Sequence, residues 1–124
     1  MYEISVDESF AAAHNLRDYH GKCEDLHGHN YKVRVILAGK ELDRTGLLYD
    51  FVHLKHVIQD VIRSLDHKYL NELPPFDTLN PSAENIARHI YDRTAQQLPK
   101  APNAAAISSV TVWETETSAA TYRE

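Results

Sequence analysis

Residues 23–37 read Cys23-Glu24-Asp25-Leu26-His27-Gly28-His29-Asn30-Tyr31-Lys32-Val33-Arg34-Val35-Ile36-Leu37. The apolar side chains from Tyr31 to Leu37 recur at every second position, which predicts a half-buried β-strand that ends at Ala38-Gly39-Lys40. Residues i and i+2 of a strand project to the same face, so an extended chain here would present the imidazoles of His27 and His29 side by side. This stretch therefore predicts a strand and a pair of metal ligands.

A partner strand is predicted at the N-terminus. Apolar and polar residues alternate over Tyr2–Val6, and Phe10 keeps the same parity. Glu8 interrupts the apolar face, which predicts a bend or bulge there. We expect this strand to pair antiparallel with the strand around Val33, the two being joined by the histidine-rich connection His14–His29.

A third histidine, His14, follows the run Phe10-Ala11-Ala12-Ala13 at the end of the partner strand. Three neutral imidazoles with a fourth coordination position left open are typical of a catalytic zinc ion rather than a structural one. We therefore predict that His14, His27 and His29 bind Zn²⁺. An alternative stays open, in which Gly28 marks a bulge and the imidazoles only line a polar patch.

Two amphipathic helices are predicted downstream. The first begins at Phe51 with Asp50 as its N-cap, and its apolar stripe has helical spacing: Leu54, Val57, Ile58, Val61, Ile62 and Leu65. The second begins near Asn80-Pro81-Ser82, where Pro81 suits the first helical position, and it ends at Leu98-Pro99. Two further strands are predicted at residues 107–113 and 118–122.

The predicted order is two strands, two helices and two strands, which gives an α+β fold with an antiparallel sheet and two helices in a single domain, residues 1–124. Exposed sheet edges on a small protein favour a homo-oligomer.

The formal net charge of −5 argues against nucleic acid as a partner. No stretch reaches the length of a membrane span. A single cysteine excludes an intramolecular disulfide and fits a reducing compartment, so we expect a soluble, cytoplasmic protein.

Three other positions carry candidate chemistry. Cys23 lies in a polar loop close to the proposed metal, which favours a base or nucleophile over a buried thiol. Asp66-His67 follows the stripe of the first helix, where the helix dipole favours a protonated histidine, although an ordinary helix C-cap explains the pair equally well. Glu114 ends a predicted strand, where a carboxylate can accept two parallel hydrogen bonds from a planar amidine edge or simply be a solvated charge.

Taken together, these residues resemble the 6-pyruvoyltetrahydropterin synthase superfamily, and more closely its 6-carboxytetrahydropterin synthase branch. The resemblance runs over almost the whole chain. Its motifs are Phe10-Ala11-Ala12-Ala13-His14, Cys23-Glu24-Asp25-Leu26-His27-Gly28-His29-Asn30-Tyr31, Asp50-Phe51, Leu65-Asp66-His67-Lys68-Tyr69-Leu70-Asn71, Asn80-Pro81-Ser82-Ala83-Glu84-Asn85 and Val112-Trp113-Glu114-Thr115.

The resemblance implies a tunnelling fold (T-fold), in which subunits join edge to edge into a trimeric β-barrel and two trimers stack as a homohexamer. It implies the following site residues: His14, His27 and His29 as zinc ligands, Cys23, Asp66 and His67 as catalytic residues, and Glu114 as the carboxylate that grips the pterin. Substrate sites in this fold lie between subunits, so Ser82 and Glu84 are expected to bind substrate and to complete a neighbour's pocket.

The resemblance also implies an activity. A zinc-dependent lyase would convert 7,8-dihydroneopterin triphosphate to 6-carboxytetrahydropterin, with loss of triphosphate and acetaldehyde, on the route to queuosine. Zinc would acidify the side-chain hydroxyls of the substrate, Cys23 would take a proton from that side chain, and His67, oriented by Asp66, would move one at the ring. The cations that could meet the triphosphate are Arg17, Lys22, Lys68 and Arg123.

Three alternatives stay open. A true 6-pyruvoyltetrahydropterin synthase would eliminate triphosphate without cleaving a side-chain carbon bond, but the three residues between Cys23 and His27 resemble the carboxy branch. A zinc hydrolase or lyase outside pterin chemistry would need neither Cys23 nor Glu114. A non-enzymatic zinc-binding or assembly module would bind the metal without turnover and would tolerate loss of Cys23 or His67.

Overall fold

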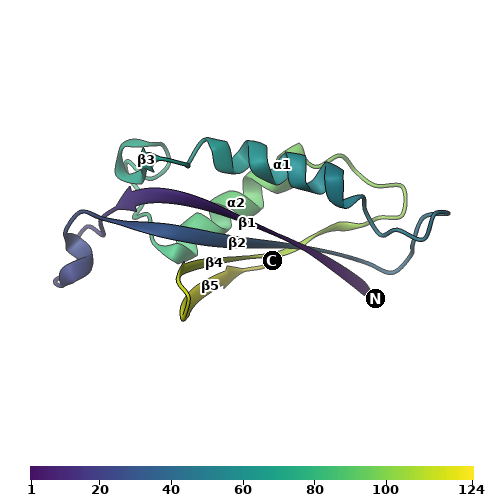
Figure 1. Ribbon diagram of the computed structural model, residues 1–124, viewed down its shortest axis with the longest axis horizontal. Coiled ribbons are helices and arrows are strands. Elements are labelled where there is room, and N and C mark those ends of the chain that lie inside the picture. The colour runs from purple at the N-terminus through teal and green to yellow at the C-terminus, as the bar shows by residue number, and fades with distance from the viewer.

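The computed structural model describes residues 1–124, which form one five-stranded sheet and two α-helices (Figure 1). In chain order the elements are β1 (Tyr2–His14), the 3-10 turn η1 (Lys22–Glu24), β2 (His27–Gly39), α1 (Phe51–Arg63), β3 (Lys68–Tyr69), the 3-10 turn η2 (Leu70–Glu72), α2 (Ala83–Gln97), β4 (Ala106–Thr115) and β5 (Ser118–Tyr122). The strand order in the sheet is β3-β1-β2-β4-β5. The predicted α+β fold is confirmed. The predicted antiparallel sheet is confirmed except at the short β3, which was not predicted and pairs parallel with β1.

The β1–β2 pair is longer and more regular than predicted. It runs from Tyr2 opposite Gly39 to His14 opposite His27 without a shift in register. The predicted bulge at Glu8 is wrong, because the register is continuous through Glu8 opposite Val33. The Glu8 carboxylate accepts a hydrogen bond from Gln59 Nε2 of α1 (3.1 Å) and so has a partner on the helix side of the sheet. The three histidines therefore lie within the ladder, and only residues 15–26 connect the two strands.

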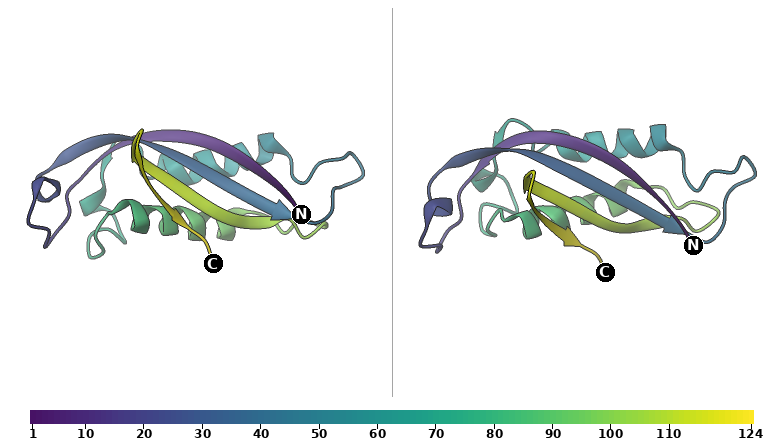
Figure 2. Two further views of the ribbon diagram at one scale, coloured as in Figure 1. Left: turned by 90° about the horizontal axis from the view of Figure 1, so that it is seen from below. Right: turned by 60° about the horizontal axis from the view of Figure 1, so that its bottom comes forward.

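The core lies between the sheet and the helices. Figure 2 shows both helices on one face of the curved sheet, while no helix covers the other face. α1 lies against β1, and α2 lies against β4 and β5. The largest buried side chains on the helix-facing side include Tyr31, Val33, Val35 and Leu37 of β2 and Leu54, Ile58, Ile86 and Ile90 of the helices. Burial of these alternating and helical stripes is the main favourable term for this arrangement.

The helix starts follow the capping residues. Asp50 Oδ1 accepts a hydrogen bond from the Val52 amide (2.8 Å), which confirms the predicted N-cap of α1. The cap of α2 is Ser82, whose hydroxyl accepts from the Asn85 amide (3.2 Å). Pro81 therefore precedes the N-cap, and its predicted place in the first helical position is wrong. The helix begins one residue after Ser82, because the Ser82 hydroxyl satisfies an amide of the first turn that has no partner within the helix.

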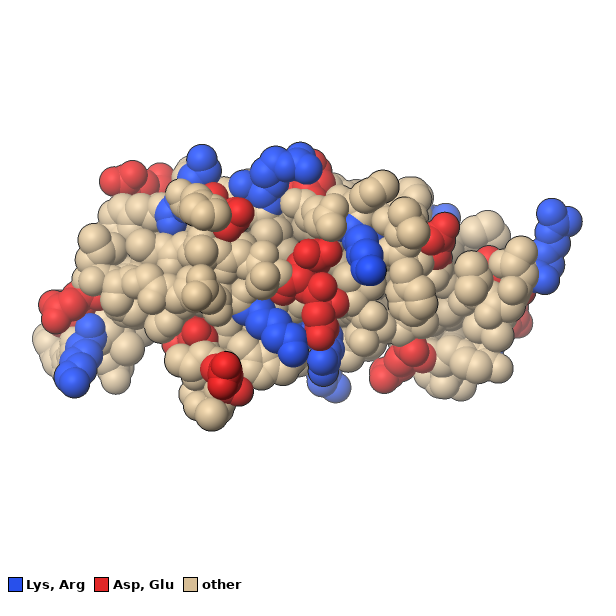
Figure 3. Space-filling view, viewed as in Figure 1, with Lys and Arg blue, Asp and Glu red and all other residues tan.

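The surface is mixed in charge. On the face shown in Figure 3, lysine and arginine side chains are interspersed with aspartate and glutamate, and no continuous basic surface crosses it. None of the helices combines the length and apolar character that crossing a membrane requires.

Candidate metal centre and active site

The three predicted metal ligands converge at one end of the sheet. His14 and His27 are directly opposed in the β1–β2 ladder, and His29 follows His27 on the same face. One ring nitrogen from each histidine lies within 4.8 Å of the others. His14 is buried, whereas His27 and His29 are half-buried. The cluster is thus partly open to solvent, as a site that receives a ligand must be.

Backbone carbonyls fix the tautomers of two of these rings. His14 Nδ1 donates to the Pro81 carbonyl (2.6 Å), and His27 Nδ1 donates to the Asp25 carbonyl (2.7 Å). A carbonyl only accepts, so in the neutral ring each Nε2 carries a lone pair. These two Nε2 atoms lie 3.0 Å apart. Two lone pairs at this distance repel each other, and a metal cation bound between them would relieve the repulsion.

The ring of His29 also has a nitrogen that is available to a metal ion. His29 Nε2 is buried and has no hydrogen-bond partner among the protein groups. Burial is the largest cause that lowers the pKa of His14, and it also lowers the pKa of His29. Both rings therefore favour the neutral form, which is the form that binds metals. A donor set of three imidazole nitrogens fits Zn²⁺.

Glu114 lies beside this cluster. Its Oε1 is 3.8 Å from His14 Nε2, and its side chain is 27% exposed. Ser82, Glu84 and Glu114 line the same hollow of about 270 Å³. The structure thus brings together, within one chain, the three residues that the resemblance assigned to substrate binding, and Glu114 connects this hollow to His14.

Cys23 lies outside the histidine cluster. It sits half-buried in η1, in the connection that begins after His14 and ends before His27. The Cys23 carbonyl accepts a hydrogen bond from the Leu16 amide (2.7 Å), which closes this connection into a compact loop. The thiol is therefore carried on a loop whose two ends are metal-ligand candidates.

The Asp66–His67 pair is attached to the edge of β1. Asp66 Oδ1 accepts from the Ala11 amide (3.0 Å) and lies 3.0 Å from His67 Nδ1, while the His67 amide donates to the Ala11 carbonyl (2.6 Å). The hydrogen bond from Ala11 is the main cause that lowers the pKa of Asp66. The helix-dipole interpretation of His67 is wrong, because α1 ends at Arg63 and Ser64 is its C-cap.

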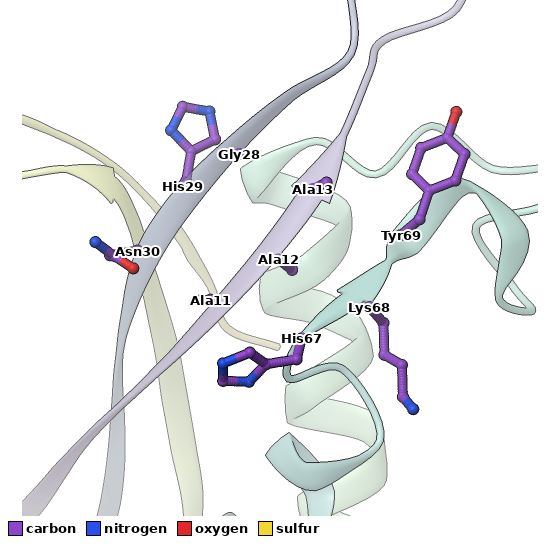
Figure 4. Close-up of a pocket in the computed structure, with 9 residues that line it drawn as sticks. All are labelled: Ala11, Ala12, Ala13, Gly28, His29, Asn30, His67, Lys68 and Tyr69. Atoms are coloured by element: carbon purple, nitrogen blue, oxygen red, sulfur yellow. The ribbon is translucent and has the colours of Figure 1, made fainter.

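The backbone and side chain of His67 are unusual. Its φ of 58° lies in the left-handed region, which few residues other than glycine adopt and which often marks functional sites. Its side chain is 80% exposed. Figure 4 shows that His67 and His29 lie on opposite sides of β1 and line one hollow of about 530 Å³. The ring of His67 is thus presented to solvent beside the strand that ends in His14.

The four candidate triphosphate cations differ in their surroundings. The Arg17 guanidinium donates to the carbonyls of Asn71 (3.2 Å), Phe76 (2.7 Å) and Leu79 (3.5 Å). It is therefore occupied in holding a loop, which argues against a phosphate role. Lys68 lines the same hollow as His67. Lys22 and Arg123 are exposed.

Three contributors near the site were not predicted from the sequence. The Pro81 carbonyl sets the tautomer of His14. The side-chain amides of Asn71 and Asn80 bind the backbone that follows His14. Asparagine offers the same donor and acceptor as a peptide group, but nothing in the local spacing shows which distant backbone it will bind.

Comparison with known proteins agrees with this geometry. The family model described as 6-pyruvoyl tetrahydropterin synthase matches residues 3–124. A 6-carboxy-5,6,7,8-tetrahydropterin synthase of Haemophilus influenzae is 34% identical over 149 aligned positions that span 100% of both chains. A 6-pyruvoyl tetrahydrobiopterin synthase of Poecilia reticulata is 35% identical over 134 positions, 97% of this chain and 88% of that one.

A solved structure shares the fold. The 6-pyruvoyl tetrahydropterin synthase of Caenorhabditis elegans superposes with a TM-score of 0.88 at 30% identity, covering 99% of this chain and 95% of that one. The matched region includes the five-stranded sheet, both helices and the histidine cluster. The chain therefore belongs to the 6-pyruvoyl tetrahydropterin synthase family and has its tunnelling fold.

Proposed function

We propose that this protein is a zinc-dependent carbon–carbon lyase that converts 7,8-dihydroneopterin triphosphate and one water molecule to 6-carboxytetrahydropterin, acetaldehyde and triphosphate, on the route to queuosine and other 7-deazaguanine compounds. The full-length relative named 6-carboxy-5,6,7,8-tetrahydropterin synthase supports this class of lyase. The main observation behind the proposal is that the Nε2 atoms of His14 and His27 lie 3.0 Å apart with their lone pairs available to a metal ion. Glu114 lies beside this pair.

The metal would be held by His14, His27 and His29. When bound there, a zinc ion supplies a Lewis acid that acidifies the hydroxyl groups of the substrate side chain. The protein's own contribution is orientation, because the carbonyls of Pro81 and Asp25 hold two of the rings with Nε2 directed to a common point.

Glu114 is proposed to bind the pterin. Its carboxylate can accept two parallel hydrogen bonds from the amidine-like edge of the ring, which fixes the substrate in one orientation. Ser82 and Glu84 line the same hollow. The sheet has open edges at β3 and β5, which supports a site completed by another subunit of a homo-oligomer, with the hexamer as our proposal.

Cys23 and His67 are proposed to move protons. The Cys23 thiolate would take a proton from the substrate side chain, and His67 would move one at the ring, with Asp66 orienting its Nδ1 (3.0 Å). Lys68 is the candidate cation for the triphosphate, because it lines the same hollow as His67. A cytoplasmic location, expected from the single cysteine, stays a prediction.

Product analysis tests the reaction. Zinc-loaded protein is incubated with dihydroneopterin triphosphate, acetaldehyde is trapped, and the pterin products are identified by mass spectrometry. Acetaldehyde together with 6-carboxytetrahydropterin is the expected result. A pyruvoyl product without acetaldehyde would instead place the protein with the Poecilia reticulata relative, whose name supports this second candidate function. No turnover with zinc bound would favour a binding module.

Two variants test the assigned roles. Cys23→Ala should keep its zinc and lose turnover, and an active Cys23→Ala protein would refute the role of the thiol. Glu114→Gln should weaken pterin binding, because an amide cannot accept both hydrogen bonds from the planar edge. Unchanged substrate affinity in Glu114→Gln would favour a zinc hydrolase that does not recognise pterins.

A further inference from the structure

The backbone directly after His14 is held by a side-chain amide. The Asn15 amide donates to Asn71 Oδ1 (3.0 Å), and Asn71 Nδ2 donates to the Asn15 carbonyl (2.9 Å). Asn71 is buried, and the two bonds reproduce the pairing of neighbouring strands. The Tyr69 hydroxyl donates to Asn15 Oδ1 (2.6 Å). Asn15 is thus fixed through both its backbone and its side chain.

A second asparagine repeats this contact two residues further on. The Arg17 amide donates to Asn80 Oδ1 (2.8 Å), and Asn80 Nδ2 donates to the Arg17 carbonyl (2.9 Å). Asn80 is itself held, because its carbonyl accepts from Asn85 Nδ2 in α2 (2.9 Å). We call Asn71 and Asn80, with these four bonds, the asparagine clamp.

The residue between the two clamped positions binds the loop that carries Cys23. The Leu16 amide donates to the Cys23 carbonyl (2.7 Å). Three consecutive residues, 15–17, therefore connect Asn71 and Asn80 to the backbone of Cys23.

We infer that Asn71 and Asn80 are positioning residues that set the place of the Cys23 thiol relative to the histidine cluster. His14 ends β1 and is tied to the Pro81 carbonyl, so the clamp begins one residue from a metal-ligand candidate, and the bond from Leu16 connects the clamped segment to the backbone of Cys23. A loop with free backbone amides opens on its own, whereas a loop paired on both sides opens only when those bonds break. The catalytic meaning of this placement rests on the proposed function of Cys23.

Asn71→Asp and Asn80→Asp test the inference. An aspartate keeps the size and the acceptor of asparagine, but it cannot donate to the carbonyls of Asn15 and Arg17 and repels them. Asn103→Asp is the matched control, because Asn103 Nδ2 also donates to two carbonyls, those of Glu41 and Leu48 (both 3.0 Å), in a loop not connected to Cys23.

The first readout is the rate at which iodoacetamide alkylates Cys23 in the zinc-loaded protein. The chain has one cysteine, so the signal is unambiguous. Rates are compared on the high-pH plateau, where the thiolate is fully formed, so that a change in thiol pKa does not enter. We expect both clamp variants to react at least about fivefold faster than wild type and Asn103→Asp to react at the wild-type rate.

The second readout is kinetic. In both clamp variants kcat should fall at least about tenfold with KM changed less than about twofold, because the substrate is still bound but the thiol is displaced. Loss of stability alone, as in Asn103→Asp, should leave kcat unchanged. Alkylation rates within about twofold of wild type in both clamp variants, or an equal rise in Asn103→Asp, would overturn the inference.

Hydrogen exchange of the wild-type protein covers the case in which a variant does not fold. The amides of Asn15, Leu16 and Arg17 should exchange as slowly as those of β1 and more slowly than those of residues 18–21. Fast exchange at residues 15–17 would equally refute the clamp. Neither alkylation nor exchange needs substrate, so a wild-type protein that makes no 6-carboxytetrahydropterin but passes both tests would contradict only the proposed function.

Discussion

His14 Nε2 and His27 Nε2 face each other at 3.0 Å, while each ring donates its Nδ1 proton to a backbone carbonyl. The two histidines are opposed residues of β1 and β2, so the sheet itself brings the rings together. Folding thus places two lone pairs where a bound metal cation would relieve their repulsion. This relationship has consequences for metal content and for the pH dependence of stability.

Removal of one ring should remove the metal. We expect wild type to bind one zinc ion per chain and His14→Ala to bind at least about 100-fold more weakly, since a ligand matters more than the groups that orient it. His53→Ala, on the exposed side of α1, should bind like wild type. Plasma mass spectrometry of the dialysed proteins measures the zinc content. Full zinc content in His14→Ala would contradict the assignment.

Zinc should also stabilise the fold. At a free concentration of 100 times its dissociation constant, a ligand specific for the native state adds about 2.7 kcal/mol to the free energy of unfolding. For a chain of this size 1 kcal/mol shifts Tm by roughly 3–6 °C, so zinc should raise Tm by roughly 8–16 °C. Scanning calorimetry before and after a chelator should show this difference in wild type and His53→Ala. A chelator-induced fall in His14→Ala of the same size would show that the ion binds elsewhere.

The metal-free protein should lose stability in mild acid. Histidines of the unfolded chain take up a proton near pH 6.5, whereas burial lowers the folded-state pKa of His14, His29 and His89. Below about pH 6.5 the unfolded state therefore binds more protons, and the free energy of unfolding falls until the folded-state pKa values are passed. Urea unfolding of chelated protein at pH 7.5, 6.5 and 5.5 measures the slope.

His14→Asn is the control for this slope. An asparagine keeps a donor for the Pro81 carbonyl but does not titrate, so the slope should become shallower, with His29 and His89 supplying the remainder. The pKa values of Asp7 and Asp66 are also lowered in the folded state, but these groups change the free energy of unfolding only below about pH 3.8, outside the range measured. An unchanged slope in His14→Asn would mean that His14 does not contribute.

Tyr31→Phe should be neutral or slightly stabilising. Tyr31 is fully buried between Phe10 and the histidine rings, and its hydroxyl has no hydrogen-bond partner in the protein, while burial raises its pKa. Removing an unpaired buried hydroxyl relieves its desolvation cost, so we expect a gain of up to about 1 kcal/mol in the free energy of unfolding.

Tyr69→Phe is the matched comparison for Tyr31→Phe. Its hydroxyl donates to Asn15 Oδ1 (2.6 Å), so its loss should cost about 1 kcal/mol by urea unfolding. A loss of more than about 1 kcal/mol in Tyr31→Phe would show that its hydroxyl has a partner that the single chain does not reveal.

Ser82 has two roles that variants can separate. Ser82→Ala removes the N-cap of α2 and should cost about 1 kcal/mol of stability. Ser82→Asn restores a capping side chain and should recover most of that loss. If the hydroxyl also contacts substrate, KM will rise in both variants. A KM that is wild-type in Ser82→Asn would leave Ser82 only its capping role.

Local patterns predicted much of the fold. The alternation around Val33 and the helical stripe from Leu54 to Leu65 placed the main strands and helices, because period two and period 3.6 reflect which side chains are buried. The N-cap at Asp50 was predicted for the same local reason. The prediction failed at Glu8, where the partner is Gln59 on α1, and at β3, whose pairing with β1 joins distant segments.

The sequence by itself determined that His27 and His29 share a face and that His14 ends the neighbouring strand, since both follow from the geometry of an extended chain. Only the tertiary structure decided which nitrogen each ring presents, because the Pro81 carbonyl lies 67 residues from His14 in the chain. It also decided that Asn71 and Asn80 hold residues 15–17 and that Ser82, Glu84 and Glu114 line one hollow. Contacts between distant segments depend on how the helices pack on the sheet, and no local spacing records that packing.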